Sequence, residues 1–378
     1  MERPPLSLYI HLPWCERKCP YCDFNSHESA AFPQAEYIES LLTDLAADLH
    51  LADGRPIETL FIGGGTPSLF SADAITGLLD GIGQQLEMTP DFEATMEANP
   101  GSAEAEKFQG FREAGINRLS IGIQSFDDQR LQALGRVHNS DQARAAISHA
   151  MDAGFDNFNI DLMHGLPGQT PRSAAADLEQ ALAFKPPHLS WYQLTVEPNT
   201  VFNKHPPLLP VEDVLADIQD AGDILLAETG MQQYEVSAYS QPGRQCRHNL
   251  NYWSFGDYLA IGAGAHGKIT GSDGQIIRYA KTRKPEDYLN ARAGRHTASS
   301  RTLSRGEIIE EFMLFALRLN CGFSEARFEA RTGLPVSDLQ PKLSILQDRG
   351  LLETAGGEVR ATGLGRRFLD SVIAEFLS

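Results

Sequence analysis

The chain has 378 residues, enough for one large domain or two moderate ones with a well-buried core. Its 32 Lys and Arg residues stand against 50 Asp and Glu residues, and the formal net charge of −18 argues against unassisted binding to nucleic acid or anionic lipid. No stretch resembles a signal peptide or reaches the length of a membrane span, and an odd count of 5 cysteines does not suit a disulfide framework. We therefore expect a soluble, cytoplasmic protein.

The first predicted element is a β-strand over residues 6–12, where apolar and polar residues alternate. Three cysteines follow it within eight residues: Cys15, Cys19 and Cys22. Thiolates select zinc or an iron–sulfur cluster over hard cations. A zinc site would need a fourth ligand, for which His27 and His11 lie nearest, whereas a 4Fe-4S cluster held by three thiolates keeps one iron open. Buried thiols without any metal are the plainer interpretation.

After the cysteines, short apolar runs alternate with helical patterns. The predicted strands cover residues 59–62, 93–98, 118–124, 157–163 and 188–196. The predicted helices cover residues 34–51, 72–86, 103–114, 140–153, 172–184 and 211–229. With the first strand these make about six βα units, which favour a parallel sheet with right-handed crossovers. The sequence therefore predicts an α/β fold with a partial (β/α)6 TIM-like barrel.

Polar and glycine-rich groups follow several of these strands, where barrel chemistry gathers. Gly63–Thr66, Glu97 and Asp161 are examples. Each carboxylate alone could equally be a helix N-cap. Their common position on the rim that also carries three thiols favours one binding site.

The spacing C-x-x-x-C-x-x-C, with Tyr21 before the last cysteine, resembles that of the radical S-adenosylmethionine (SAM) family. From Leu6 to about His266 the chain looks like the subgroup that contains oxygen-independent coproporphyrinogen III oxidases and heme chaperones. The resemblance implies that the three cysteines hold a 4Fe-4S cluster and that SAM chelates the open iron. The residues that it assigns to SAM are Tyr9, Tyr21, Gly64, Gly65, Thr66, Glu97, Gln124, Arg136 and Asp161.

Two departures separate the chain from the oxidase branch. That branch carries a further cysteine two positions after the third ligand, where this sequence has Phe24. It also has a substantial segment before the first strand, for which a strand starting at Leu6 leaves no room. We therefore do not expect coproporphyrinogen oxidase activity. The oxidase reaction, a radical decarboxylation of porphyrinogen propionates, is kept as the alternative hypothesis.

The motif His-Asn-x-x-Tyr-Trp, formed here by His248, Tyr252 and Trp253, resembles the heme-chaperone branch, where it is associated with heme binding. The imidazole could ligate iron and the two rings could pack on a macrocycle. Two nearby arginines could pair with propionates: Arg244 and Arg247. Cys246 is a rival ligand, and outside this family a single histidine beside aromatic rings is more often structural.

Residues 262–267 match G-x-G-x-x-G, but the sequence that follows predicts a hairpin rather than a helix, so we reject a dinucleotide site. Residues 281–304 are predicted to be a polar linker with one short helix at 285–292. Helical stretches and a hairpin at Gly356–Gly357 then resemble a small winged-helix-like domain. Because it lacks a dense basic face, we expect packing or partner docking rather than nucleic-acid binding.

We divide the chain into a radical SAM partial barrel with the cluster and SAM site (1–240), a heme-associated segment and linker (241–300) and a winged-helix-like domain (301–378). The resemblance implies a heme chaperone that delivers heme to acceptor hemoproteins, such as respiratory cytochromes or membrane respiratory complexes. Peripheral attachment to the inner membrane would suit such delivery. A monomer and a homodimer both fit the sequence.

Overall fold

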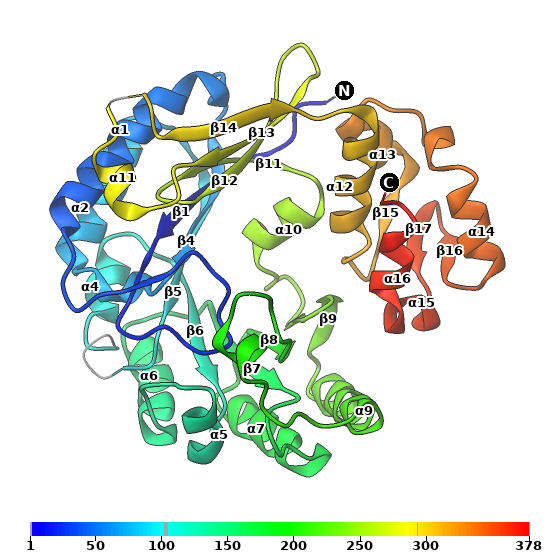
Figure 1. Ribbon diagram of the computed structural model, residues 1–378, viewed down its shortest axis with the longest axis horizontal. Helices are drawn as coiled ribbons and strands as arrows, with labels where there is room; N and C mark the ends of the chain where they lie inside the picture. The colour runs from blue at the N-terminus through cyan, green and yellow to red at the C-terminus, as the bar shows by residue number, and fades with distance from the viewer. Residues whose placement is uncertain (1, 102–104, 293, 378) are drawn as a thin grey trace.

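The computed structural model describes residues 2–101, 105–292 and 294–377, and in this part of the chain a twelve-stranded sheet forms the frame. The strand order is β14-β13-β12-β11-β1-β4-β5-β6-β7-β8-β10-β9. The sheet curves around a central space, and most helices cover its outer face (Figure 1).

Seven consecutive strands of this sheet pair in parallel: β11 (Asp257–Ile261) and, next to it, the six strands of the βα units. The six are β1 (Leu6–Leu12), β4 (Ile57–Gly64), β5 (Met88–Ala98), β6 (Arg118–Gln124), β7 (Phe158–His164) and β8 (His188–Gln193). The helices on their outer face are α1 (Gln34–Ala52), α2 (Ala72–Gly83), α4 (Phe108–Glu113), α6 (Ser140–Asp152), α7 (Pro171–Ala183) and α9 (Glu212–Glu228). The predicted partial barrel is confirmed. Residues 103 and 104, at the start of one predicted helix, lie outside the described residues.

The alternation in β1 separates two environments. Leu8 and Ile10 are fully buried against the outer helices, whereas Ser7, Tyr9 and His11 lie on the other side of the strand. Ser7 bonds there to Thr59 of β4, with an Oγ–Oγ distance of 2.7 Å. The inner face of β1 therefore carries polar groups, in contrast to its apolar outer face.

The sheet extends beyond the six strands of the βα units on both sides. On one side lie β11 (Asp257–Ile261), β12 (His266–Thr270), β13 (Ile276–Lys281) and β14 (Thr297–Thr302), and on the other lie β10 (Ala238–Ser240) and β9 (Gln232–Glu235). The hairpin predicted after Gly267 is confirmed as β12 and β13.

The short helix predicted at 285–292 is confirmed as α11 (Pro285–Leu289). The prediction of a linker is wrong for residues 297–302, which form the edge strand β14 and pair with β13. All six residues of β14 are exposed and most are polar, so the strand has no hydrophobic alternation. Backbone pairing alone reveals it.

Helix α10 (Arg247–Trp253) lies on the concave side of the sheet, and the C-terminal domain lies beside it (Figure 1). That domain contains α12 (Arg305–Ala316), β15 (Phe323–Ser324), α13 (Glu325–Thr332), η2 (Val336–Leu339), α14 (Lys342–Asp348), β16 (Leu352–Ala355), β17 (Glu358–Ala361), α15 (Gly363–Arg367) and α16 (Leu369–Ala374). It has its own hydrophobic core, which Phe255 from the sheet region joins. Within the described ranges, no helix is long and apolar enough to cross a bilayer.

Candidate functional site

A cavity of about 740 Å³ lies at the carboxyl ends of the parallel strands. Most of the predicted cluster and SAM residues line it: Cys15, Cys19, Tyr21, Cys22, Gly64, Gly65, Thr66, Glu97, Gln124, Arg136 and Asp161. Tyr9 does not line the cavity, because its hydroxyl lies 2.9 Å from Nδ1 of His11 and its ring stacks on Phe61. The fold therefore brings residues that are up to 146 positions apart, Cys15 and Asp161, to one wall.

The cysteine loop is held in shape by its own backbone. The short strands β2 (Trp14–Cys15) and β3 (His27–Glu28) pair with each other at its base. Lys18 crosses the loop, and its Nζ donates to the carbonyls of Phe24 at 3.0 Å and Ser26 at 3.2 Å. The strand pair and the Lys18 hydrogen bonds thus fix the conformation of the loop that carries the three thiols.

All three cysteines of the loop are free thiols. Burial raises the pKa of the Cys15 and Cys22 thiols. Across the described residues, no three His, Cys, Asp or Glu side chains gather closely enough to hold one metal ion. An iron–sulfur cluster attaches each thiolate to a different iron, so its ligands need not meet at one point, and three thiols around a cavity fit such a group.

One of the two histidines considered as a fourth zinc ligand already has partners on its ring. Both ring nitrogens of His11 already have partners: Nδ1 lies 2.9 Å from the Tyr9 hydroxyl, and Nε2 lies 2.9 Å from the carbonyl of Asn25. His11 is therefore not available as the fourth zinc ligand.

The glycine turn after β4 packs directly against the cysteine loop. Gly64 has a φ of +115°, and a Cβ on Gly65 would lie 2.4 Å from the carbonyl oxygen of Trp14. The Thr66 N–H donates to the same carbonyl at 2.7 Å. Only glycine allows this approach, which brings backbone polar groups to the cavity wall.

Two carboxyl groups face the cavity from β5 and β7, the strands on either side of β6. Glu97 accepts a hydrogen bond from the Gly64 N–H at 3.2 Å, and burial, with a smaller effect of Asp161, raises its pKa to about 7. Asp161 accepts from Ser120 Oγ at 2.9 Å and Asn159 Nδ2 at 2.7 Å, and burial raises its pKa too. Both groups can accept hydrogen bonds from the amino or hydroxyl groups of a polar ligand.

Arg136 lies between the cysteine loop and the strand ends. Its guanidinium donates to Asn99 Oδ1 at 2.6 Å and to the Gly122 carbonyl at 2.9 Å, and it lies 3.6 Å from Cys19 Sγ. Asn99 in turn donates to Thr66 Oγ1 at 3.1 Å. Asn99 was not among the residues predicted to bind a cofactor, although it follows the end of β5 just as Glu97 lies near that end.

His248 lies in a second, separate environment on α10. Its Nδ1 lies 2.8 Å from Thr59 Oγ1, and Thr59 donates its own hydroxyl proton to Ser7. This pattern assigns the imidazole proton to Nδ1 and leaves Nε2 with a free lone pair. Burial lowers the pKa of His248 to about 3, so the ring is neutral at pH 7.

The surroundings of His248 are aromatic but closed. Tyr252 contacts the imidazole edge-on at 4.8 Å and Phe61 lies at 5.2 Å, both measured between ring centroids. Nε2 is buried and has no hydrogen-bond partner among the described residues. The donor chemistry of His248 fits heme iron, whereas a ligand reaches the buried Nε2 only after α10 or the rings packed on His248 move.

The two arginines expected to meet propionates are engaged elsewhere. Arg244 lies 3.8 Å from Asp156, and Arg247 lies 3.1 Å from Asp91 and 3.7 Å from Glu58. The structure thus gives both arginines carboxylate partners of the protein itself.

A different arginine adjoins the predicted heme segment. The guanidinium of Arg318, from the C-terminal domain, lies 4.4 Å from the ring centre of Trp253, and Arg318 also lines the cluster cavity. No sequence pattern near Arg318 predicts these contacts, because only tertiary packing brings the side chain to Trp253 and to the cluster cavity.

Comparisons with known proteins agree with this geometry. The family model of the Radical SAM superfamily matches residues 9–181, and that of the HemN C-terminal domain matches residues 303–368. The solved structure of coproporphyrinogen III oxidase (HemN) from Escherichia coli superimposes with a TM-score of 0.84 over 99% of this chain and 90% of that chain, at 23% identity. The fold and site thus define a radical SAM protein with a HemN-type C-terminal domain.

Two relatives narrow the assignment. The heme chaperone HemW of Escherichia coli is 48% identical over 100% of both chains. The heme chaperone HemW of Haemophilus influenzae is 47% identical over 99% of this chain and 98% of its own. The chain belongs to the HemW family.

Proposed function

We propose that this protein is a heme chaperone of the cytoplasm, which binds heme and transfers it to acceptor hemoproteins, respiratory cytochromes among them. The observation that carries the proposal is the full-length similarity to proteins named heme chaperone HemW, at 48% identity for the Escherichia coli protein. The neutral, metal-competent imidazole of His248 supports it from the chemistry of this chain.

We assign the cluster and SAM to the cavity at the strand ends. Cys15, Cys19 and Cys22 would hold a 4Fe-4S cluster, which supplies a redox-active centre with one open iron. The remaining cavity residues would hold SAM: the glycine turn through its backbone, Arg136 opposite the carboxylate, and Asp161 opposite the ribose hydroxyls. Their hydrogen bonds to Asn99, Gly122, Ser120 and Asn159 would keep these groups oriented.

We assign heme binding to residues of α10. His248 would ligate the iron through Nε2, with Tyr252 and Trp253 as apolar faces for the macrocycle. Cys246 is a weaker candidate, since burial raises the pKa of its thiol to about 11 and the thiolate is the form that binds metal.

The alternative function is that of a coproporphyrinogen oxidase, which shares the fold. We would give the anaerobically reconstituted protein a reductant, SAM and coproporphyrinogen III, and titrate the same preparation with heme. The chaperone proposal predicts stoichiometric heme binding and no protoporphyrinogen IX. Turnover to protoporphyrinogen IX without a saturable heme site would overturn it.

A further inference from the structure

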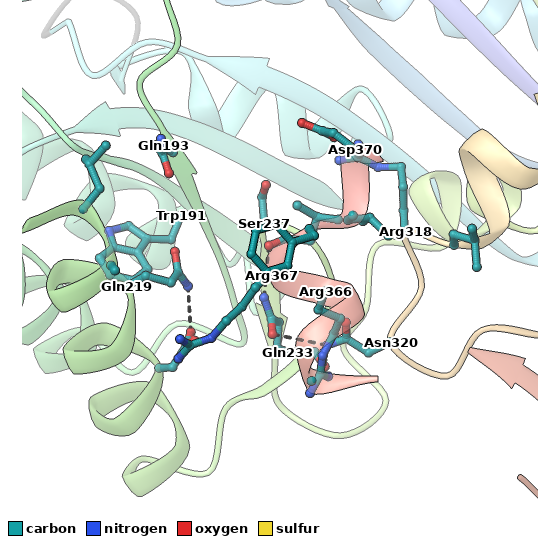
Figure 2. Close-up of a pocket in the computed structure, with 18 of the residues that line it drawn as sticks. Trp191, Gln193, Gln219, Gln233, Ser237, Arg318, Asn320, Arg366, Arg367 and Asp370 are labelled. Carbon is teal, nitrogen blue, oxygen red and sulfur yellow. Dashed lines mark hydrogen bonds between the residues drawn. The ribbon is translucent and has the colours of Figure 1, made fainter. Parts of the chain in front are cut away.

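A second and larger cavity, of about 960 Å³, lies between the barrel and the C-terminal domain. Figure 2 shows Trp191 and Gln219 on its barrel side, opposite Arg318, Arg366 and Asp370. Its volume is at the upper end of the range of small-molecule sites, which is about 300–1,000 Å³. The cavity can therefore admit a ligand as large as a macrocycle.

The carboxylates that line this cavity have structural roles. Asp220 pairs with Arg367 at 2.9 Å, and Asp223 accepts hydrogen bonds from the Tyr239 hydroxyl at 2.6 Å and from Gln219 at 2.9 Å. The other two stand in the first turns of α9 and α16, where they complement the helix dipole: Glu212 and Asp370.

Two cations of the same cavity retain unused donors. Arg366 is exposed and makes no ion pair within the described part of the chain. The ion pair that Arg318 makes within the described residues is a long one, at 3.5 Å from Glu235, and its buried Nε has no hydrogen-bond partner there. These two guanidinium groups can therefore bind an anion, and guanidinium groups suit carboxylates best.

The apolar part of the wall comes from both domains. Trp191 and Leu317 are buried in it, whereas Leu314 is 41% and Phe368 is 55% exposed. Exposed apolar side chains beside unused guanidinium groups match a ligand with a flat apolar body and carboxylate arms.

Arg318 also connects this cavity to both parts of the proposed site. Arg318 and Gln193 line the larger cavity and the cluster cavity alike, so the two cavities adjoin there. The same guanidinium stacks on Trp253 of α10. A carboxylate bound at Arg318 would therefore lie at the boundary between the cluster cavity and the heme segment.

We propose that the cavity between α9, β9 and the C-terminal helices α15 and α16 is a porphyrin-binding site, with Arg318 and Arg366 as the anchors of the porphyrin carboxylates. The inference rests on the proposed function, because the chaperone role is what identifies the ligand as a porphyrin. The proposed site is distinct from His248, and a porphyrin could enter it before α10 moves.

The test measures binding of zinc protoporphyrin IX, and of its dimethyl ester, to the full cluster-free chain by fluorescence. We expect the free acid to bind more tightly than the ester, and Arg318→Gln and Arg366→Gln each to weaken binding of the acid about tenfold to a hundredfold, as for a lost charge-assisted hydrogen bond. Ester binding should be the same in all variants. Arg349→Gln, which removes an exposed arginine paired with Glu375 in the same domain, is the matched control.

Three results separate this site from the proposed function. Acid-selective binding that persists in His248→Ala supports the cavity site. Equal affinity of the wild-type protein for acid and ester overturns the cavity site. A saturable heme site that depends on His248 alone, and is unchanged by both arginine substitutions, also overturns it but leaves the proposed chaperone function intact. If the wild-type protein binds no porphyrin, both proposals fail. The ester comparison needs no variant, so it decides even if Arg318→Gln fails to fold.

Discussion

At the scale of single residues, burial shifts the pKa values of two groups in the proposed sites, His248 and Glu97. His248 is neutral because burial lowers its pKa to about 3, and its proton is fixed on Nδ1 by Thr59. Glu97 holds its proton up to about pH 7 for the same physical reason, acting on an acid instead of a base. Both states can be tested by substitution.

We expect His248→Ala to remove or shift the Soret band of the heme complex without changing the cluster, because no other neutral imidazole replaces Nε2 on α10. The lost bond to Thr59 should also lower the free energy of unfolding by about 1–3 kcal/mol. Absorbance spectra before and after heme addition provide the measurement. An unchanged Soret band would rule out His248 as the ligand, and exposed His50→Ala is the control.

Cys19→Ala should abolish assembly of the cluster while heme still binds, because Cys19 and α10 belong to different environments. Iron and sulfide analysis after anaerobic reconstitution measures the first effect, and heme titration measures the second. Cys321→Ala, at an exposed free thiol, should assemble the cluster normally. A folded Cys19→Ala protein that no longer binds heme would contradict the separation of the two sites.

Glu97 should make the stability of the cluster-free protein depend on pH. Burial raises its pKa from 4.5 to about 7, so between these values the folded protein holds a proton that the unfolded chain has released. The contribution of Glu97 to stability is therefore present at low pH and is lost as the pH rises through about 7.

Relative to wild type, Glu97→Gln should gain unfolding free energy when the pH is raised from about 5 to about 8. Urea unfolding at the two pH values measures the difference. Glu113→Gln, at an exposed glutamate of α4, should show no such gain. A Glu97→Gln protein that follows wild type over the whole range would show that Glu97 does not titrate there.

At the scale of elements, α10 is the part whose position decides access to His248. Asn251 pins it: its Nδ2 donates to Ser7 Oγ of β1 at 2.8 Å and to the Asp257 carbonyl of β11 at 2.9 Å. Tyr252 packs edge-on against Tyr258, with ring centroids 4.2 Å apart. These contacts keep Nε2 closed until the helix moves.

Asn251→Ala should loosen α10 and make heme association with His248 faster, because opening of the helix then costs less. Two lost hydrogen bonds should lower the free energy of unfolding by about 1–3 kcal/mol. Stopped-flow mixing with heme measures the rate, and Asn249→Ala on the same helix is the control. An association rate equal to or slower than that of wild type would contradict gating by α10.

The sequence alone predicted the six strands of the βα units and their helices because each carries a periodic apolar pattern and a turn or cap at its end. Asn139 and Thr170, for example, begin α6 and α7 with capping boxes. It could not predict β14, whose exposed residues lack alternation, or the parallel pairing of β11 with β1. Such pairing is decided by contacts about 250 residues apart along the chain.

The same reasoning applies to the candidate site. The residues that line the cluster cavity follow strand ends, so topology alone predicted that they lie together. Arg318 comes from another domain and no local pattern indicates it. The burial of Nε2 of His248 could not be predicted either, because a sequence motif gives residue types and does not show which side chains pack around them.

At the scale of the whole molecule, the C-terminal domain is held to the sheet by a few specific contacts. Phe255 is fully buried and meets Phe312 with ring centroids 5.5 Å apart, and Lys268 Nζ lies 4.1 Å from the centre of its ring. Asn320 donates to the Gln233 carbonyl of β9 at 2.8 Å. This docking places Arg318 at the boundary of the two cavities.

Phe255→Ala should lower the free energy of unfolding by about 3–5 kcal/mol, since it empties a buried site between the domain and the sheet. The C-terminal domain should also become more sensitive to limited proteolysis. Chemical denaturation and timed digestion measure the two effects. Leu364→Ala, at a side chain that is 51% exposed, should change neither, and a Phe255→Ala protein that resists both treatments would contradict this account of the docking.

The pairing of β1 also has a consequence for synthesis. Of the six strands of the βα units, β1 leaves the ribosome first, yet its second partner, β11, begins only at Asp257, after every other strand of the six has met both of its neighbours. At about 5–20 residues per second, roughly 10–50 s separate the two strands. During that interval the nascent chain carries an unpaired strand edge next to the cysteine loop, and the barrel side of the protein becomes complete only when translation has passed the heme segment.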